Sequence, residues 1–134
     1  GVCITKISGR MDATTVGAFS DECQKLLNSG TGRFIIDLGG LEYISSAGLR
    51  GILTMVKACK SKGAVLAFCS LQSMVADMFK LSGFTSMLNV FPGIDEALAD
   101  DRFFRPTVGD LRKGRNDRNL RGMEISSGDK AEAV

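Results

Sequence analysis

The sequence predicts an α/β domain in which short β-strands alternate along the chain with amphipathic helices. Two apolar runs, at residues 34–38 and 64–69, are typical of strands that are covered on both faces. Between such runs, apolar residues recur every three or four positions, which indicates helices with one buried face. Strands separated in this way pair in parallel through crossover helices. We therefore expect a small mixed sheet of about four or five strands, with about four helices packed mainly on one of its faces.

The predicted elements follow one another in a regular order. The chain has 134 residues, 44% of them hydrophobic, which suffices for one domain with a single core. The predicted strands cover residues 2–8, 34–38, 64–69 and 87–91, where Gly9 and the pair Gly39-Gly40 end the first two. The predicted helices end near residues 28, 60–63, 80 and 104, and the first is capped by Asp12 or Thr14.

Two serines stand where the second predicted helix begins. Ser45 or Ser46 is expected to be the N-cap, because a hydroxyl there accepts a free backbone N–H of the first helical turn. The positive end of the helix dipole also favours an anion at this position. A serine on a loop at the start of a helix can carry a phosphate without breaking the fold, so this loop is a candidate for a phosphorylation switch.

Several chemistries are excluded by composition. The chain has no histidine, so a Ser-His-Asp hydrolase is ruled out, and its four cysteines show no C-x-x-C spacing for zinc. The glycines form neither of the common phosphate-binding patterns, G-x-x-x-x-G-K-[ST] and G-x-G-x-x-G. A net charge of +2 and the lack of a long apolar run give no reason to expect a nucleic-acid or membrane partner. We expect a cytoplasmic protein with reduced cysteines, without metal, cofactor or enzymatic activity.

The sequence changes character after residue 105. Residues 106–134 contain five basic side chains between positions 112 and 121, together with several glycines and few large apolar residues. Such composition favours disorder over packing. We therefore predict one domain over residues 1–105 and a basic, flexible tail over 106–134, with a short docked helix around residues 111–120 as the alternative.

Three motifs resemble those of STAS domains, specifically of bacterial anti-sigma factor antagonists. They are the strand and serine loop at residues 37–50, the segment Ile7-Ser8-Gly9-Arg10-Met11-Asp12, and Leu81-Ser82-Gly83-Phe84. Their order and spacing match the family over roughly residues 2–100. The resemblance implies the STAS fold, with one more strand before Val2. We expect that first edge strand to be missing or trimmed, which would leave a sheet edge able to pair with another chain.

The resemblance also implies a switch between partners. An unphosphorylated antagonist binds an anti-sigma factor, which is also a serine kinase of the GHKL type, and frees the sigma factor. Phosphorylation of Ser46 would switch this binding off, and a phosphatase would restore it; Ser45 is the alternative acceptor. Members of the family carry an aspartate at the place of Ser45 and Ser or Thr at that of Ala47. The implied partner-binding residues are Asp12, Ser45, Ala47, Gly48, Leu49 and Arg50.

Other interpretations of these residues stay open. Asp12 and Asp37 follow strands that look adjacent, so they either face the serine loop or only form turns. Arg50 is either an exposed helix charge or a contact to the partner or the phosphoserine, and Tyr43 is expected to pack under the loop. The chain as a whole could instead be an unphosphorylated STAS scaffold of a transporter or lipid-trafficking complex, or a small nucleotide- or anion-binding domain. Phosphorylation by a kinase, or thermal stabilisation by nucleotides, would distinguish these functions.

Overall fold

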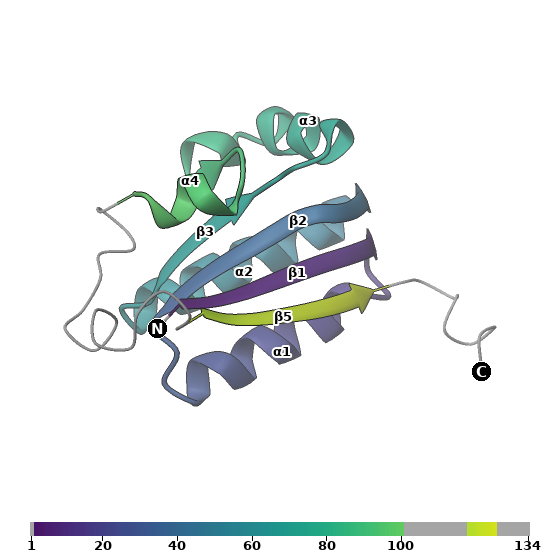
Figure 1. Cartoon of the computed structure of the whole chain (residues 1–134). Coiled ribbons are helices and arrows are strands. Elements are labelled where there is room, and N and C mark those ends of the chain that lie inside the picture. Colours follow the sequence, from purple (N-terminus) through teal and green to yellow (C-terminus); the bar gives the residue numbers. More distant parts are fainter. Residues whose placement is uncertain (1, 101–117, 126–134) are drawn as a thin grey trace.

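A five-stranded parallel sheet forms the centre of the molecule (Figure 1). The computed structural model describes residues 2–100 and 118–125. The strands are β1 (Val2–Met11), β2 (Arg33–Ile44), β3 (Val65–Cys69), β4 (Val90–Phe91) and β5 (Arg118–Ile125), in the order β4-β3-β2-β1-β5. The helices are α1 (Val16–Asn28), α2 (Ser46–Ser61), α3 (Ser73–Leu81) and α4 (Ile94–Leu98), with a short 3-10 turn over Phe84–Ser86. The predicted α/β class is confirmed, although all described strand pairs are parallel and the sheet is therefore not mixed.

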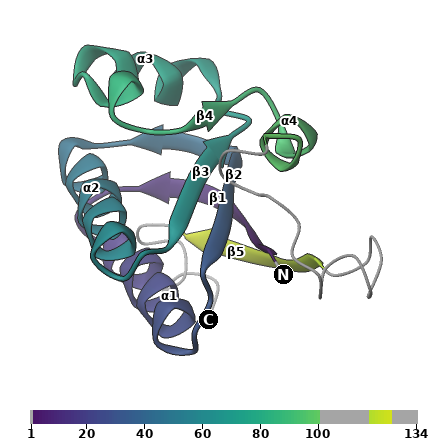
Figure 2. The ribbon, with the colours of Figure 1, turned by 90° about the vertical axis from the view of Figure 1, so that its left-hand side faces the viewer.

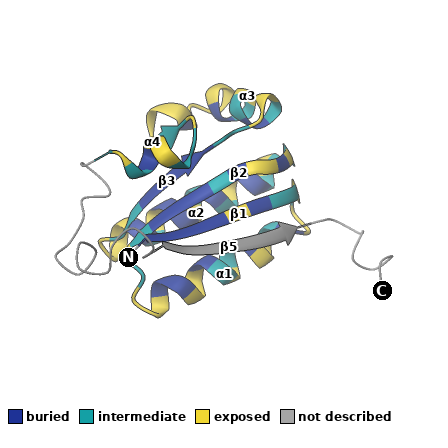
Figure 3. Cartoon of the chain, viewed as in Figure 1, coloured by how far each residue is buried: buried dark blue, intermediate teal, exposed yellow. Residues whose placement is uncertain are grey.

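The helices cover the two faces of the sheet unequally. Figure 2 shows α1, α2 and α3 on one side of the sheet and α4 on the other. Side chains alternate between the faces along a strand, so Phe34 and Ile36 join the large core under the first three helices, whereas Ile35 joins a smaller core under α4. The helices thus pack mainly on one face, as predicted. Figure 3 shows the resulting band of buried residues along β1, β2 and β3.

The first two strands are longer than predicted. Gly9 and the Gly39-Gly40 pair were expected to end them, but β1 continues to Met11 and β2 to Ile44. The pairing register shifts between Lys6 and Ser8 and again between Gly9 and Arg10; each shift places one extra residue in β2, so the pairing continues past the glycines through bulges in β2. Gly9 has a φ of 106°, a conformation that disfavours larger residues. The extension pairs Met11 with Ile44 and so brings the ends of both strands together.

Helix α1 begins at a different N-cap residue from the predicted one but ends where predicted. Thr15 is its N-cap residue, not Asp12 or Thr14, and the Thr15 hydroxyl donates to the Arg10 carbonyl at 2.7 Å instead of capping the helix. At the other end, Gly30 has a φ of 96°, and its N–H donates to the Leu27 carbonyl while that of Thr31 donates to Leu26. These two bonds form a Schellman motif, so the predicted stop at residues 28–30 is confirmed.

A strand lies within the stretch predicted to be a flexible tail. Residues 118–125 form β5 and pair in parallel with β1 from Val2↔Arg118 to Gly9↔Ile125. The edge of β1 that was expected to be open is therefore occupied, and residues 118–120 are strand, not the alternative docked helix. Residues 101–117 and 126–134 lie outside the described part of the chain. Helix α4 ends at Leu98, so the predicted end of the fourth helix near residue 104 is wrong. The domain boundary at 105 stays a prediction.

The four cysteines are free and buried, which makes a prediction about their chemistry. Burial, together with the nearby thiols of Cys59 and Cys3, raises the pKa of Cys23 to about 12 from its ordinary 9.0, and burial raises that of Cys59 to about 11. Neutral, inaccessible thiols react slowly. We expect iodoacetamide at pH 8 to add four groups to the denatured chain and none to the native one, as read by intact mass. Rapid modification of the native protein would contradict this.

The raised pKa values of Cys23 and Cys59 predict how the stability of the fold changes at high pH. Their folded pKa values lie above the unfolded value, so the unfolded state loses its protons first. The protonated thiols should therefore stabilise the folded state fully below about pH 9. The free energy of unfolding should fall as the pH rises toward 11–12. Urea titrations of the wild type and of Cys23→Ala between pH 8 and 11 test this, because the variant should lose less stability over that range. An equal loss in both proteins would contradict the assignment to Cys23.

Candidate functional site

The serine loop connects the end of β2 to the start of α2 and is tied to β1. The backbone N–H of Ser45 donates to the Met11 carbonyl at 2.9 Å. Ser45 has an extended backbone, and its hydroxyl accepts the N–H of Gly48 at 3.2 Å. Ser45 is therefore the N-cap of α2, which resolves the choice between the two serines left open by the sequence.

Loss of this cap should be measurable. In Ser45→Ala the Gly48 N–H loses its acceptor, so we expect the free energy of unfolding to fall by about 1 kcal/mol. Chemical denaturation followed by circular dichroism would measure the change. Ser46→Ala is the matched control, because its hydroxyl does not cap the helix, and it should leave stability within about 0.5 kcal/mol of the wild type. Equal losses in both variants would contradict this assignment of the cap.

Ser46 is the first residue of α2 and is exposed. Its side chain stands at the end of a 16-residue helix where the free backbone N–H groups and the positive end of the dipole lie. The first turn of α2 contains no acidic residue, so no carboxylate of the helix already occupies this favourable position. A negative group on Ser46 would be electrostatically stabilised there.

Two of the predicted partner-binding residues are instead buried beneath the loop. Leu49 is 6% exposed and belongs to the main core. Gly48 is buried as well, and a Cβ atom there would lie 2.7 Å from the Met11 carbonyl oxygen. These residues hold the loop close to β1 and present little surface, whereas Ser45 and Ala47 are half-buried.

Of the two aspartates, only Asp12 lies beside the serine loop. Met11, which accepts the hydrogen bond from Ser45, immediately precedes it. The Asp12 carboxylate accepts the N–H of Thr14 at 2.9 Å and its hydroxyl at 2.6 Å, so it shapes the turn between β1 and α1. The expectation that Asp12 lies near the serines is consistent with this placement.

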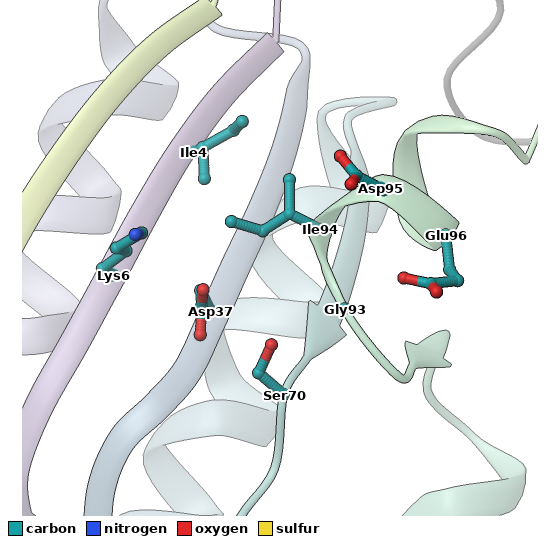
Figure 4. A pocket seen from close by; sticks show the side chains of 8 residues that line it. All are labelled: Ile4, Lys6, Asp37, Ser70, Gly93, Ile94, Asp95 and Glu96. Carbon is teal, nitrogen blue, oxygen red and sulfur yellow. The ribbon is translucent and has the colours of Figure 1, made fainter.

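Asp37 faces the other side of the sheet. It lines a hollow of about 440 Å³ under α4, together with Lys6 and Ser70 (Figure 4). Its carboxylate accepts the N–H of Gly39 at 2.7 Å. The interpretation that Asp37 faces the serine loop is therefore wrong. Along β2 its side chain alternates with those of Ile36 and Leu38, which point toward the helices that carry the site.

Arg50 is exposed one helical turn beyond Ser46, on the same helix. The structure places a second arginine, Arg10, near this end of the sheet, a position that the sequence pattern did not indicate. The guanidinium of Arg10 lies 4.3 Å from the ring centre of Tyr43, its register partner on β2. Tyr43 is half-buried and contacts Arg10, and its packing under the serine loop stays a prediction. Only the pairing of two strands distant in sequence brings these side chains together.

Within residues 2–100 and 118–125, no helix combines the length and the apolar character that crossing a membrane requires.

Comparison with known proteins connects this chain to a family. The STAS domain model matches residues 1–97. BtrV of Bordetella bronchiseptica, described as a candidate anti-sigma factor antagonist, is 34% identical over 92 residues, which are 69% of this chain and 77% of BtrV.

Two solved structures show the same fold. A candidate anti-sigma factor antagonist from Thermotoga maritima superposes with a TM-score of 0.66 at 22% identity, over 72% of this chain and 86% of the other. The STAS domain of a SulP transporter from Vibrio cholerae gives 0.61 at 15% identity, over 73% and 78%. The predicted STAS fold is confirmed. Because it occurs in both a candidate antagonist and a transporter domain, the fold alone does not choose between these functions.

Proposed function

Because this chain belongs to the STAS domain family, we propose that it is an anti-sigma factor antagonist controlled by phosphorylation of Ser46. In its unmodified form it binds an anti-sigma factor and thereby releases a sigma factor. The similarity to BtrV supports this function over the transporter role, since BtrV is the relative with higher sequence identity. The observation that carries the proposal is the exposed Ser46 on the first turn of α2.

The local structure supports Ser46 over Ser45 as the phosphate acceptor. The Ser45 hydroxyl is engaged with the Gly48 N–H and half-buried, so a kinase would have to break the N-cap to reach it. The Ser46 side chain is exposed and does not cap the helix. A phosphate at Ser46 would add about 1.5 to 2 negative charges beside the positive end of α2, so the fold should tolerate it.

The partner surface then consists of the exposed and half-buried residues around Ser46. Arg50 lies one turn further along α2, and the half-buried Ala47 and Asp12 lie at the same end of the sheet. We propose that the anti-sigma factor packs against this surface and, as a serine kinase of the GHKL type, transfers the γ-phosphate of ATP to the Ser46 hydroxyl. The bond between the β–γ bridging oxygen and the γ-phosphorus breaks, a phosphoester forms and ADP leaves. The hydroxyl proton passes to a base of the kinase. A phosphatase would hydrolyse the ester and restore binding.

Phosphorylation tests this function directly. The wild-type chain, Ser46→Ala and Ser45→Ala would each be incubated with the cognate anti-sigma factor and ATP, and their intact masses compared. We expect a single added phosphate on the wild type and on Ser45→Ala, and none on Ser46→Ala. Phosphate on Ser46→Ala would refute Ser46 as the acceptor, whereas no phosphate on the wild type despite tight binding would favour the unphosphorylated scaffold instead.

A further inference from the structure

A row of positively charged side chains runs along the exposed side of α2 and begins at Arg50, one helical turn after Ser46. The cations Arg50, Lys57 and Lys60 are all exposed, and the helix contains no aspartate or glutamate. At about 100° per residue, these three residues and Ser46 fall on one side of the helix, within about 80° of arc. From Ser46 to Lys60 this side is about 21 Å long. We call Arg50, Lys57 and Lys60 the cationic stripe.

The core fixes which way the cationic stripe faces. Ile52, Met55, Val56 and Cys59 on the opposite side of α2 are buried against the sheet, so the helix cannot turn without exposing them. In the described part of the chain, none of the three cations takes part in an ion pair. The nearby Lys62 donates a hydrogen bond to the amide oxygen of Asn28 at 2.9 Å. Because Asn28 is neutral, this bond does not neutralise the charge of Lys62.

We propose that the cationic stripe docks an acidic surface of the anti-sigma factor. This inference rests on the proposed function and specifies the chemistry of the partner: carboxylates spaced along about 20 Å opposite α2. Three cations on one helix are fewer than the six to ten phosphate contacts of a typical duplex-binding protein, so the stripe suits a protein partner better than nucleic acid.

The position of Ser46 at one end of the cationic stripe gives phosphorylation a second effect. A phosphate on Ser46 would stand four residues before Arg50, the spacing at which opposite charges on a helix attract each other. It would engage Arg50 and reduce the charge of the stripe from +3 to about +1. Acidic groups of the partner would then meet a weaker field and a dianion at its end. Phosphorylation and the stripe therefore act on the same contact.

Charge reversals with a matched control test the proposal. Lys60→Glu and Lys57→Glu alter the stripe, whereas Lys80→Glu changes net charge by the same amount in the last turn of α3, where Lys80 is exposed as Lys60 is in the last turn of α2. Association with the cognate anti-sigma factor would be followed by stopped flow at 50 and 300 mM salt. We expect each stripe variant to associate about tenfold more slowly than Lys80→Glu at 50 mM salt, and this difference to shrink at 300 mM. Melting temperatures would confirm that all variants fold.

The outcomes separate this inference from the function on which it rests. If the wild type binds and is phosphorylated but Lys57→Glu and Lys60→Glu associate as fast as Lys80→Glu, the stripe proposal is wrong and the proposed function stands. If the wild type neither binds nor accepts phosphate, both are wrong. Binding of short duplex DNA or anionic vesicles that the stripe variants abolish, without any change in association with the anti-sigma factor, would likewise overturn it.

Discussion

Ser46→Asp is expected to retain the fold and to lose about 100-fold or more in affinity for the anti-sigma factor, a change of roughly 3 kcal/mol. The residue is exposed at the first position of α2, so the new carboxylate enters no core. It lies beside the positive end of the helix, which should leave the melting temperature equal to or slightly above that of the wild type. Toward a partner that fits the unmodified loop, it adds both a charge and its hydration shell. Isothermal titration calorimetry measures the loss.

Ser46→Asn separates charge from shape in this experiment. Asparagine has nearly the same size as aspartate but is neutral, so it tests whether the side chain excludes the partner by bulk alone. We expect Ser46→Asn to lose clearly less affinity than Ser46→Asp. If both variants lose the same amount, the exclusion is steric; if Ser46→Asp binds as tightly as the wild type, the switch at Ser46 is refuted.

The second large effect is expected from Gly48→Ala, which should reduce the free energy of unfolding by about 1–3 kcal/mol. A Cβ atom at this position would lie 2.7 Å from the Met11 carbonyl oxygen and 2.8 Å from Cγ1 of the buried Ile44. Neither can move freely, because one belongs to the backbone of β1 and the other to the core. The same Met11 carbonyl accepts the Ser45 N–H, so relief of the clash must displace the serine loop. Urea denaturation should show the lower free energy of unfolding, and the rate of Ser46 phosphorylation should change because the loop is displaced.

Gly17→Ala is the control for this substitution. Gly17 is an exposed helical glycine near the start of α1, and a Cβ there would meet nothing within 4 Å. Alanine restricts the unfolded chain and favours the helix, so this variant should gain up to about 1 kcal/mol. Opposite signs for the two glycines are therefore expected, and a stable Gly48→Ala protein with normal phosphorylation would show that close packing at Gly48 is not what places the loop.

Local patterns were sufficient to predict the start of α2. Apolar spacing located the helix, and the hydroxyl side chains located its cap to within one residue. The choice of Ser45 rests on the hydrogen bond that its hydroxyl accepts from the Gly48 N–H, and a backbone bond to Met11 holds Ser45 beside a segment far away in the sequence. The cationic stripe follows from the same spacing, but its significance depends on which side of the helix is buried.

Features that depend on long-range pairing were not predictable. The extension of β1 and β2 past Gly9 and Gly39 requires each strand to support the other through bulges. β5 is a basic segment with an internal glycine, and only its pairing with β1 makes it a strand. Asp37 was misplaced because β2 is apolar on both faces at this point, so alternation does not say which face the serine helix covers.

Titration of the stoichiometrically phosphorylated chain against the anti-sigma factor, beside the unmodified chain, tests the central claim most directly. Phosphate confined to Ser46 should reduce affinity by at least about 100-fold while the melting temperature stays within a few degrees of the unmodified protein. Equal affinities of the two forms would contradict the claim that this hydroxyl governs the choice of partner.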